Sequence, residues 1–371
     1  MKIIVIGPYF PFRGGIADTN QELCNTLLKY GHSVEVINFK LQYPSVLFPG
    51  KTQLSKKTSG KTIDSKKIIN SINLLNWFKC SKKINDLNPD IVISSYWTSF
   101  MSPCLSTINR NLKKKIIKIG IIHNAYPHEK ILLQKYFFKF YLNSITKYYT
   151  LSKNVFEQIK LINKEKKGIE LFHPIPKKFG EPVSVEIAKE KAGLNKSFKY
   201  LLFFGVIREY KGLDVLIKAM KKVVKHDNKI KLLVIGENYE SIEKYKNLAI
   251  KENVYDNIHF NNEYVNDDEI KYWFCSAKLI IQPYKSASQS GITPLAIQFE
   301  IPTVCSNIMG LSEYITESKD GFLSNPNPRD LANKIIFALN FDLDLIKKEL
   351  STKKKKYSWN NFTNKLIQKN D

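Results

Sequence analysis

Short apolar runs alternate with stretches of helical periodicity along the whole chain. Runs of this kind, rich in Ile, Val, Leu, Phe and Tyr, are typical of strands buried on both faces of a parallel sheet. In the first part of the chain we expect them at residues 2–6, 33–39, 89–93, 115–122 and 148–152. Between them, apolar residues at helical spacing predict helices, such as Leu23 and Leu27, four positions apart, with Leu28 before Gly31.

Two segments of this first part depart from the alternation. Residues 41–66 are polar and rich in Lys, and no period emerges, so we expect a long loop. From Glu129 to Tyr149 the pattern predicts a helix in which apolar and basic residues alternate. Such a helix either packs on the core with a solvated face or lies on an anionic membrane leaflet.

The alternation begins again at Tyr200, after residues 177–199, which lack apolar runs and mark a domain boundary. We expect the second set of strands at residues 200–204, 231–235, 258–260, 278–282 and, closing the set, 303–305. A chain of 371 residues with this pattern is predicted to be an α/β protein of two domains. Asp267 and Asp268 stand just before a helical pattern, which favours helix capping over a metal pair.

One strand-loop-helix stretch, Lys199–Met220, carries the clearest candidate chemistry. Gly205 ends the apolar run, Arg208 and Lys211 follow in the loop, and Gly212 precedes the helix. Such a loop lies at the carboxyl edge of a parallel sheet, where α/β folds bind ligands, and it places two cations beside a helix N-terminus. We therefore expect an anion, typically a phosphate, although two solvated loop residues would give the same pattern.

Charge and cysteine content indicate the kind of partner and the compartment of the protein. The chain has 58 Lys and Arg against 34 Asp and Glu, a net charge of +24, which points to an anionic partner such as nucleic acid or an acidic membrane surface. No nucleic-acid-binding motif is present, so we expect no nucleic acid. The five cysteines are scattered singly, which favours a reducing cytosol over disulfides or zinc. Without an apolar stretch long enough for a signal peptide or a membrane span, we expect a soluble or peripheral protein.

A second candidate group follows the apolar run at residues 115–122. His123 and Asn124 come directly after it, and His128 and Glu129 follow. A His that leaves a central strand is placed for a ligand cleft, although on this observation alone a buried structural His is the more frequent interpretation.

Four motif blocks, taken together, resemble a known family. They are Gly14-Gly15-Ile16 with Gly31-His32; His123-Asn124 with His128-Glu129; Phe204-Gly205 with Arg208 and Lys211-Gly212; and Pro283 to Gly291, continuing to Pro302 and Gly310-Leu311-Ser312-Glu313. In this order and spacing the chain resembles the retaining GT-B glycosyltransferases of the GT4 type, the glycosyl transferases group 1, over nearly its whole length.

The resemblance implies a fold and a domain plan. Two Rossmann-like domains would face each other across a central cleft, with the acceptor on residues 1–180 and the nucleotide-sugar on residues 181–350. Residues 351–371 would form a closing helix that crosses back onto the first domain. The resemblance also implies that neither a metal nor another cofactor is needed, because the nucleotide-sugar is a substrate.

The family's residue roles map onto positions of this chain. Arg208 and Lys211 would neutralise the leaving diphosphate, and His123 would reach the transferred sugar; these are the catalytic candidates. The implied donor-binding residues are Gly15, Gly205, Gln289, Ser290, Gly291, Ile292 and Glu313. On the acceptor side the implied residues are Asn124, His128 and Glu129.

The implied function is transfer of a sugar from a nucleotide-sugar to a glycan or lipid-linked acceptor, in surface polysaccharide synthesis at the inner face of the cell membrane. The chain also departs from the family pattern. Family members typically carry two glutamates around the last helix start, whereas residues 286–299 contain neither Asp nor Glu. This departure leaves open a GT-B-like subunit that binds a nucleotide-sugar or glycan without catalysis.

Overall fold

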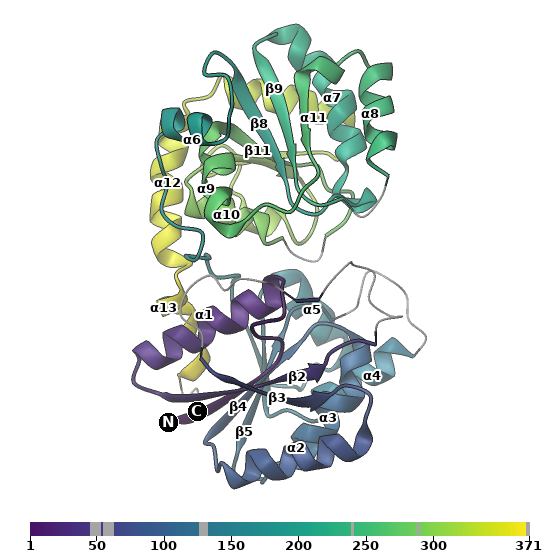
Figure 1. Cartoon of the computed structure of the whole chain (residues 1–371), viewed down its shortest axis with the longest axis vertical. Helices are drawn as coiled ribbons and strands as arrows, with labels where there is room; N and C mark the ends of the chain where they lie inside the picture. Colours follow the sequence, from purple (N-terminus) through teal and green to yellow (C-terminus); the bar gives the residue numbers. More distant parts are fainter. Residues whose placement is uncertain (45–52, 55–62, 126–132, 239–240, 288–289, 369–371) are drawn as a thin grey trace. The chain divides into compact units, whose positions relative to one another are not determined.

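The structure, a computed structural model, describes residues 1–44, 53–54, 63–125, 133–238, 241–287 and 290–368. It divides into two compact units, one formed by Met1–His173 with Trp359–Asp371 and the other by Pro174–Ser358 (Figure 1). The domain plan expected from the sequence had boundaries near residues 180 and 350. The chain instead passes between the units at 173/174 and at 358/359.

The first unit is built on a parallel sheet of order β3-β2-β1-β4-β5-β6-β7. Its strands are β1 (Lys2–Ile6), β2 (Ser33–Leu41), β3 (Ser65–Asn70), β4 (Ile91–Tyr96), β5 (Ile117–Ile122), β6 (Lys147–Thr150) and β7 (Gly168–Glu170). The apolar runs correctly predicted the inner strands. The two edge strands, β3 and β7, were not predicted, because an edge strand keeps one side in water and carries polar residues such as Lys66 and Lys67.

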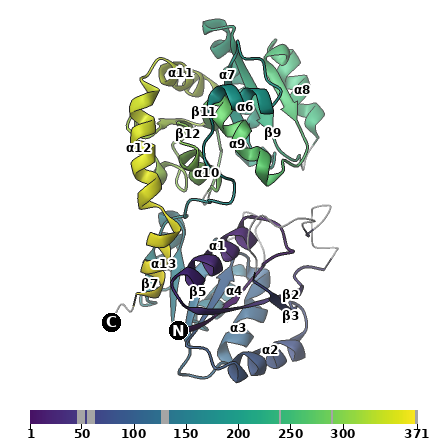
Figure 2. The ribbon, with the colours of Figure 1, turned by 60° about the vertical axis from the view of Figure 1, so that its left-hand side comes forward.

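Helices cover both faces of this sheet. One face is packed by α2 (Leu74–Asp86), α3 (Ser102–Arg110), α4 (Gln134–Leu142) and α5 (Lys153–Ile162). The opposite face is packed by α1 (Gly15–Lys29) and α13 (Trp359–Ile367), which lie side by side (Figure 2).

The helix expected from Glu129 to Tyr149 is shorter than its pattern suggested. Within the described residues α4 ends at Leu142, and Lys147–Thr150 is strand β6, which pairs with β5. Tyr148 and Tyr149 are fully buried on opposite faces of the sheet, one in each of its two cores. A two-residue period therefore governs Lys147–Thr150.

The second unit repeats the plan with a parallel sheet of order β10-β9-β8-β11-β12-β13. Its strands are β8 (Lys199–Phe204), β9 (Ile230–Ile235), β10 (Ile258–Asn261), β11 (Ala277–Gln282), β12 (Thr303–Ser306) and β13 (Phe322–Ser324). The expectation that residues 303–305 close the set was wrong. Strand β13 lies beyond them, and it is too short to give a periodic signal.

The helices of this unit also form two layers. One layer consists of α7 (Leu213–His226), α8 (Ile242–Lys251) and α11 (Pro328–Leu339). The other consists of α6 (Val185–Lys191), α9 (Asp267–Ser276) and α10 (Ile292–Gln298). No helix in the described part of the chain is both long and apolar enough to cross a membrane.

The end of the chain forms two helices where one was expected. Helix α12 (Leu343–Lys356) belongs to the second unit and α13 to the first, with Tyr357 and Ser358 between them. Three side chains of α13, those of Trp359, Phe362 and Leu366, are at most 4% exposed in the core that α1 also lines. The backbone amide of Ile175 donates to the carbonyl of Tyr357 at 3.0 Å, so the two chain passages lie next to each other.

Candidate active site

Strand β8 ends in a glycine that makes room for a lysine. Gly205 has φ of 97°, a left-handed conformation that side chains rarely adopt. A Cβ atom at this position would lie 3.1 Å from Nζ of Lys211 and 3.4 Å from Cδ1 of Ile292. The predicted donor-binding residues Gly205 and Ile292 and the predicted catalytic Lys211 therefore meet at one point.

A second glycine fixes the loop that carries the lysine. Glu209–Lys211 form a single 3-10 turn, and Gly212 follows it with φ of 70°. A Cβ atom at Gly212 would lie 2.0 Å from the carbonyl oxygen of Pro283, just after β11. Because only glycine permits this approach, the β8 loop lies directly against the end of β11, and α7 begins at Leu213.

Lys211 is a buried cation. Its side chain belongs to a residue only 8% exposed, and within the described residues no carboxylate lies at ion-pair distance from its ammonium. Burial, and next the charge of Arg208, lower the pKa of Lys211 from 10.5 to about 8. A buried ammonium without a counter-ion is unfavourable, so this position favours the arrival of an anion.

Arg208 is the second cation of the loop. It precedes the 3-10 turn with an extended backbone and is partly buried. Its guanidinium is close enough to Lys211 to disfavour protonation of the lysine. Two cations that repel each other in this way form a site for a group carrying more than one negative charge.

Tyr284, which follows β11, connects the lysine to the start of α10. It is 3% exposed, and its ring centre lies 5.6 Å from Nζ of Lys211. Burial raises the pKa of Tyr284, and its hydroxyl hydrogen-bonds the side chain of Ser290. The hydroxyl oxygen of Ser290 in turn accepts from the backbone amide of Ile292 at 3.2 Å.

Sequence reasoning missed Tyr284, although it lies inside the Pro283–Gly291 block. The edge-on contact with Tyr210, 6.0 Å between ring centres, shows that it also supports the β8 loop. A salt bridge of 2.9 Å between Lys285 and Asp214 joins the same two segments from outside. The loops after β8 and β11 are therefore held together by three kinds of contact: backbone, aromatic and ionic.

The other predicted donor-side residues divide into three cases. Gly291 directly precedes α10, where an added Cβ would meet nothing within 4 Å. Glu313 is exposed in a 3-10 turn after β12, two residues beyond Leu311, which packs against Tyr284. Gln289 lies outside the described residues.

In the first unit, His123 lies at the carboxyl end of β5. It is 3% exposed, and its Nε2 has no hydrogen-bond partner among the described residues. Burial, followed by the nearby His173, lowers the pKa of His123 to about 3, so the imidazole is neutral at pH 7. Asn124 follows it, whereas His128 and Glu129 lie outside the described residues.

The predicted Gly15 begins α1 at the same edge of this sheet. Gly14, the residue before it, has φ of 115°, and a Cβ at Gly15 would meet nothing within 4 Å. The approach to this loop is held by Asn20, a residue that sequence reasoning did not single out. Its Nδ2 donates to the carbonyl of Pro8 at 2.8 Å, and its Oδ1 accepts from the Ser95 hydroxyl at 2.6 Å.

The chain is similar to known proteins. Residues 184–359 match the model of the family described as Glycosyl transferases group 1. An uncharacterized glycosyltransferase of Methanocaldococcus jannaschii, MJ1178, is 25% identical over 97% of this chain and 95% of its own length.

Solved structures give the fold. A sucrose-phosphate synthase from Thermosynechococcus elongatus superposes with a TM-score of 0.75 at 15% identity, covering 98% of this chain and 97% of its own. Alr3699/HepE of Anabaena, in complex with UDP and glucose, gives 0.72 at 13% identity, covering 99% and 98%. The resemblance to GT-B glycosyltransferases is confirmed: the chain is a glycosyltransferase of GT-B fold, and its residues 184–359 match the model of the glycosyl transferases group 1.

Proposed function

We propose that this glycosyltransferase takes its sugar from a nucleoside-diphosphate sugar and transfers it, with retention as in the GT4 type, to a glycan or lipid-linked saccharide. We place the reaction in the synthesis of a surface polysaccharide: a capsule, an O-antigen or an exopolysaccharide. The observation that carries the proposal is the buried ammonium of Lys211, which has no carboxylate partner in the described structure and stands beside a second cation, Arg208.

In this proposal the two cations act on the leaving group. As the bond to the sugar breaks, negative charge grows on the diphosphate, and fixed positive charges in a partly dry site stabilise that change. Arg208 can hold two oxygens at once, and Lys211 supplies a compact charge. Gly205 lets the diphosphate approach the ammonium without a side chain in the way. Because the related fold of HepE holds UDP and glucose, a UDP-sugar is the first donor to test.

His123 contributes hydrogen bonding rather than charge. A neutral imidazole can donate from one nitrogen and accept at the other, as a sugar hydroxyl requires. Its Nε2, unpartnered in the described structure, is the atom we assign to a sugar hydroxyl or ring substituent. A buried polar atom without a partner is unfavourable, so a ligand that supplies one gains affinity from it.

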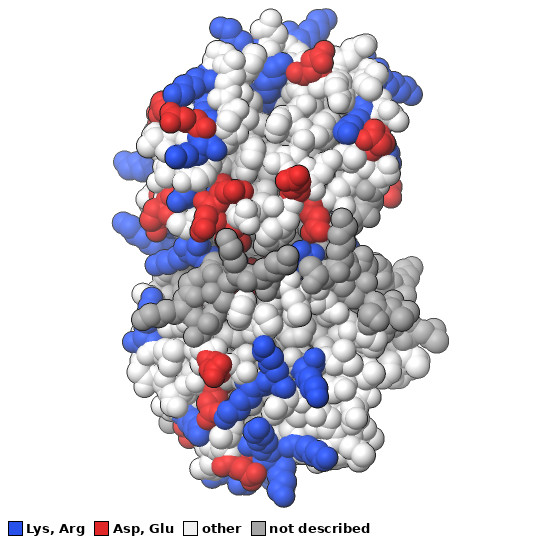
Figure 3. Space-filling model, viewed as in Figure 1, with Lys and Arg blue, Asp and Glu red and all other residues white. Residues whose placement is uncertain are grey.

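We place a membrane contact on the surface of α4 and α5. Leu133, Tyr136 and Leu161 there are 55%, 73% and 83% exposed, which is unusual for residues of their size. A groove of about 530 Å³ between the two helices is lined by Lys135 and Lys139 as well as by Tyr136 and Leu161. Lysines beside exposed apolar side chains suit an anionic leaflet, and Figure 3 shows Lys and Arg spread over both units.

The test of the donor site is a thermal-shift screen against UDP-, GDP-, ADP- and CDP-sugars. A ligand that binds only the folded state adds about 2.7 kcal/mol of stability at a hundredfold excess over its Kd. We expect one nucleotide to raise Tm in the native protein and in Lys218→Ala, an exposed lysine of α7, but not in Lys211→Ala. A shift that survives in Lys211→Ala would contradict the proposal.

A second candidate function is a subunit that binds the nucleotide-sugar without transferring it. The absence of any acidic residue between Ser286 and Phe299 favours it, because the family's glutamates for sugar and ribose have no counterpart there. The discriminating measurement is release of free nucleotide from the donor identified in the screen. Binding without any release, with acceptor saccharides present, would establish this second function in place of the first.

A further inference from the structure

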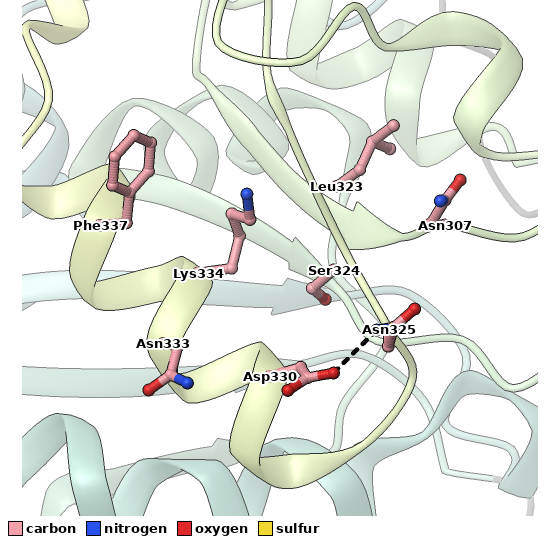
Figure 4. Close-up of a pocket in the computed structure, with 8 residues that line it drawn as sticks. All are labelled: Asn307, Leu323, Ser324, Asn325, Asp330, Asn333, Lys334 and Phe337. Atoms are coloured by element: carbon pink, nitrogen blue, oxygen red, sulfur yellow. Dashed lines mark hydrogen bonds between the residues drawn. The ribbon is translucent and has the colours of Figure 1, made fainter.

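A separate pocket lies in the second unit at the carboxyl end of β13. It occupies about 490 Å³ between this strand and the first turns of α11 (Figure 4). Sites for small molecules typically have about 300–1,000 Å³. None of the lining residues that the structure describes belongs to the loops after β8 and β11 that carry Lys211 and Tyr284.

One residue of the lining carries a buried hydroxyl without a hydrogen-bond partner among the described residues. Ser324, the last residue of β13, is 5% exposed, and its Oγ has no hydrogen-bond partner among the described residues. Figure 4 shows its side chain between the strand and α11, among the other residues of the lining. Buried polar atoms are nearly always paired, so this hydroxyl points to a ligand that can donate or accept a hydrogen bond.

A carboxylate is held in a fixed orientation on the opposite side. Oδ2 of Asp330 accepts from the side-chain amides of Asn325 at 2.8 Å and of Asn327 at 3.0 Å. Its other oxygen, Oδ1, accepts no hydrogen bond from the described residues. A carboxylate oriented by amides, with one oxygen left for a ligand, is well suited to accept from a hydroxyl group.

The charge of the pocket argues against a phosphate. Lys334, the one cation among the described lining residues, forms a salt bridge of 2.7 Å with Glu317, and Asp330 adds a negative charge. The remaining polar lining consists of amides such as Asn333, and the half-exposed ring of Phe337 adds an apolar wall. Hydroxyl, amide, carboxylate and aromatic groups together match a neutral sugar ring, which has hydroxyls on its rim and apolar C–H groups on its faces.

We propose that this pocket, lined by Ser324, Asn325, Asp330, Asn333 and Phe337, is a second saccharide-binding site of the protein. It takes a neutral sugar unit and no phosphate. In a glycosyltransferase such a site would hold a glycan chain at a point away from the diphosphate-binding loop. Sugar binding in this pocket and donor binding at Lys211 can therefore be measured separately.

The experiment uses the full chain with [13C]-methyl leucine labelling, because Leu323 lines the pocket and reports on it directly. The probes are the methyl glycosides of D-glucose, D-galactose, N-acetyl-D-glucosamine and L-rhamnose, each titrated with UDP present to fill the donor site. Leu323→Ile assigns the resonance. We expect at least one glycoside to shift the Leu323 methyl signals, while inorganic phosphate does not.

Two variants make the result specific. Asp330→Ala removes the ligand-facing oxygen but keeps the cap of α11, because Asn327 accepts from the backbone amide of residue 330. We expect this variant to bind the glycoside at least tenfold more weakly than the native protein. Arg329→Ala, an exposed neighbour on α11 outside the pocket, leaves the affinity unchanged. The proposal is overturned if none of the glycosides shifts Leu323, if phosphate produces the same shift, or if Asp330→Ala binds as tightly as the native protein.

Discussion

The ammonium of Lys211 lies 3.1 Å from the position that a Cβ atom would occupy at Gly205. The two residues are separated by the β8 loop, and the contact exists because the 3-10 turn folds the lysine back over the end of its own strand. The missing side chain and the buried charge are thus parts of one arrangement. A side chain added at residue 205 would therefore contact the ammonium of Lys211.

We therefore expect Gly205→Ala to impair donor binding more than stability. The left-handed backbone makes alanine unfavourable by about 1 kcal/mol, and the new methyl group pushes the ammonium away. The prediction is at least a tenfold increase in Kd for the nucleotide, measured by calorimetry, with Tm lowered by only a few degrees. An unchanged Kd in a folded variant would show that the position of the ammonium is not critical.

The lowered pKa of Lys211 predicts that donor binding takes up protons. With a pKa of about 8, part of the Lys211 population is neutral at pH 8, and a bound diphosphate raises the pKa and restores the charge. We expect uptake of about half a proton at pH 8, and weaker binding as the pH rises above 8. Calorimetry in two buffers of different ionisation enthalpy measures the uptake. Lys211→Arg is the matched variant: its guanidinium stays charged at pH 8, so the uptake should vanish.

Gly212 is predicted to be a structural requirement. Gly212→Ala combines a left-handed φ with a Cβ placed 2.0 Å from the oxygen of Pro283, so the loop must move. We expect a loss of more than about 2 kcal/mol in the free energy of unfolding, measured in urea. Gly291→Ala is the control: its φ is −75° and the described surroundings are open, so its effect should stay within about 0.5 kcal/mol. Equal effects for the two variants would refute the role of the Pro283 contact.

His123 should not titrate in the usual range. Burial lowers its pKa from 6.5 to about 3, so the stability that the neutral imidazole contributes is present above pH 6.5 and is lost as the pH falls toward 3. We expect its C–H resonance, assigned with His123→Asn, to stay flat from pH 8 to pH 5. The variant should lower kcat/KM at least about tenfold, the value of one lost hydrogen bond. A titration midpoint of this resonance near pH 6.5 would contradict the burial of His123.

The apolar surface of α4 and α5 predicts selective vesicle binding. We expect the native protein to sediment with vesicles containing phosphatidylglycerol and not with pure phosphatidylcholine. Replacing Tyr136 and Leu161 together with Ser should reduce the bound fraction several-fold, since both side chains are largely exposed. The control is Leu345→Ser on α12, where the leucine is 59% exposed; this variant should bind as the native protein does.

The sequence predicted more of the fold than of the site. Inner strands such as β1, β5 and β8 are continuous apolar runs because both of their faces are buried. Their amino-acid composition therefore reveals them in the sequence. The edge strand β3 and the three-residue β13 leave little such trace. Arg208 and Lys211 could be found from their place after a strand.

The burial of Lys211 could not be found in this way. It depends on the contact between Gly212 and Pro283, which are distant in sequence and close only after folding. The same holds for Tyr284, whose contacts with Lys211 and Ser290 join two loops. A motif gives the residue types of a site, whereas the charge states come from packing across elements.

Helix α13 has a consequence for how the protein is made. Trp359, Phe362 and Leu366 fill the core of the first unit, although they leave the ribosome after the whole second unit. Residues 1–173 are therefore synthesised before the second unit, but their core is complete only when α13 has been made. Until then the apolar face of α1 lacks the helix that covers it. A stop codon after Ser358 would remove only α13 and the few residues after it, but it would expose the core of the first unit to water.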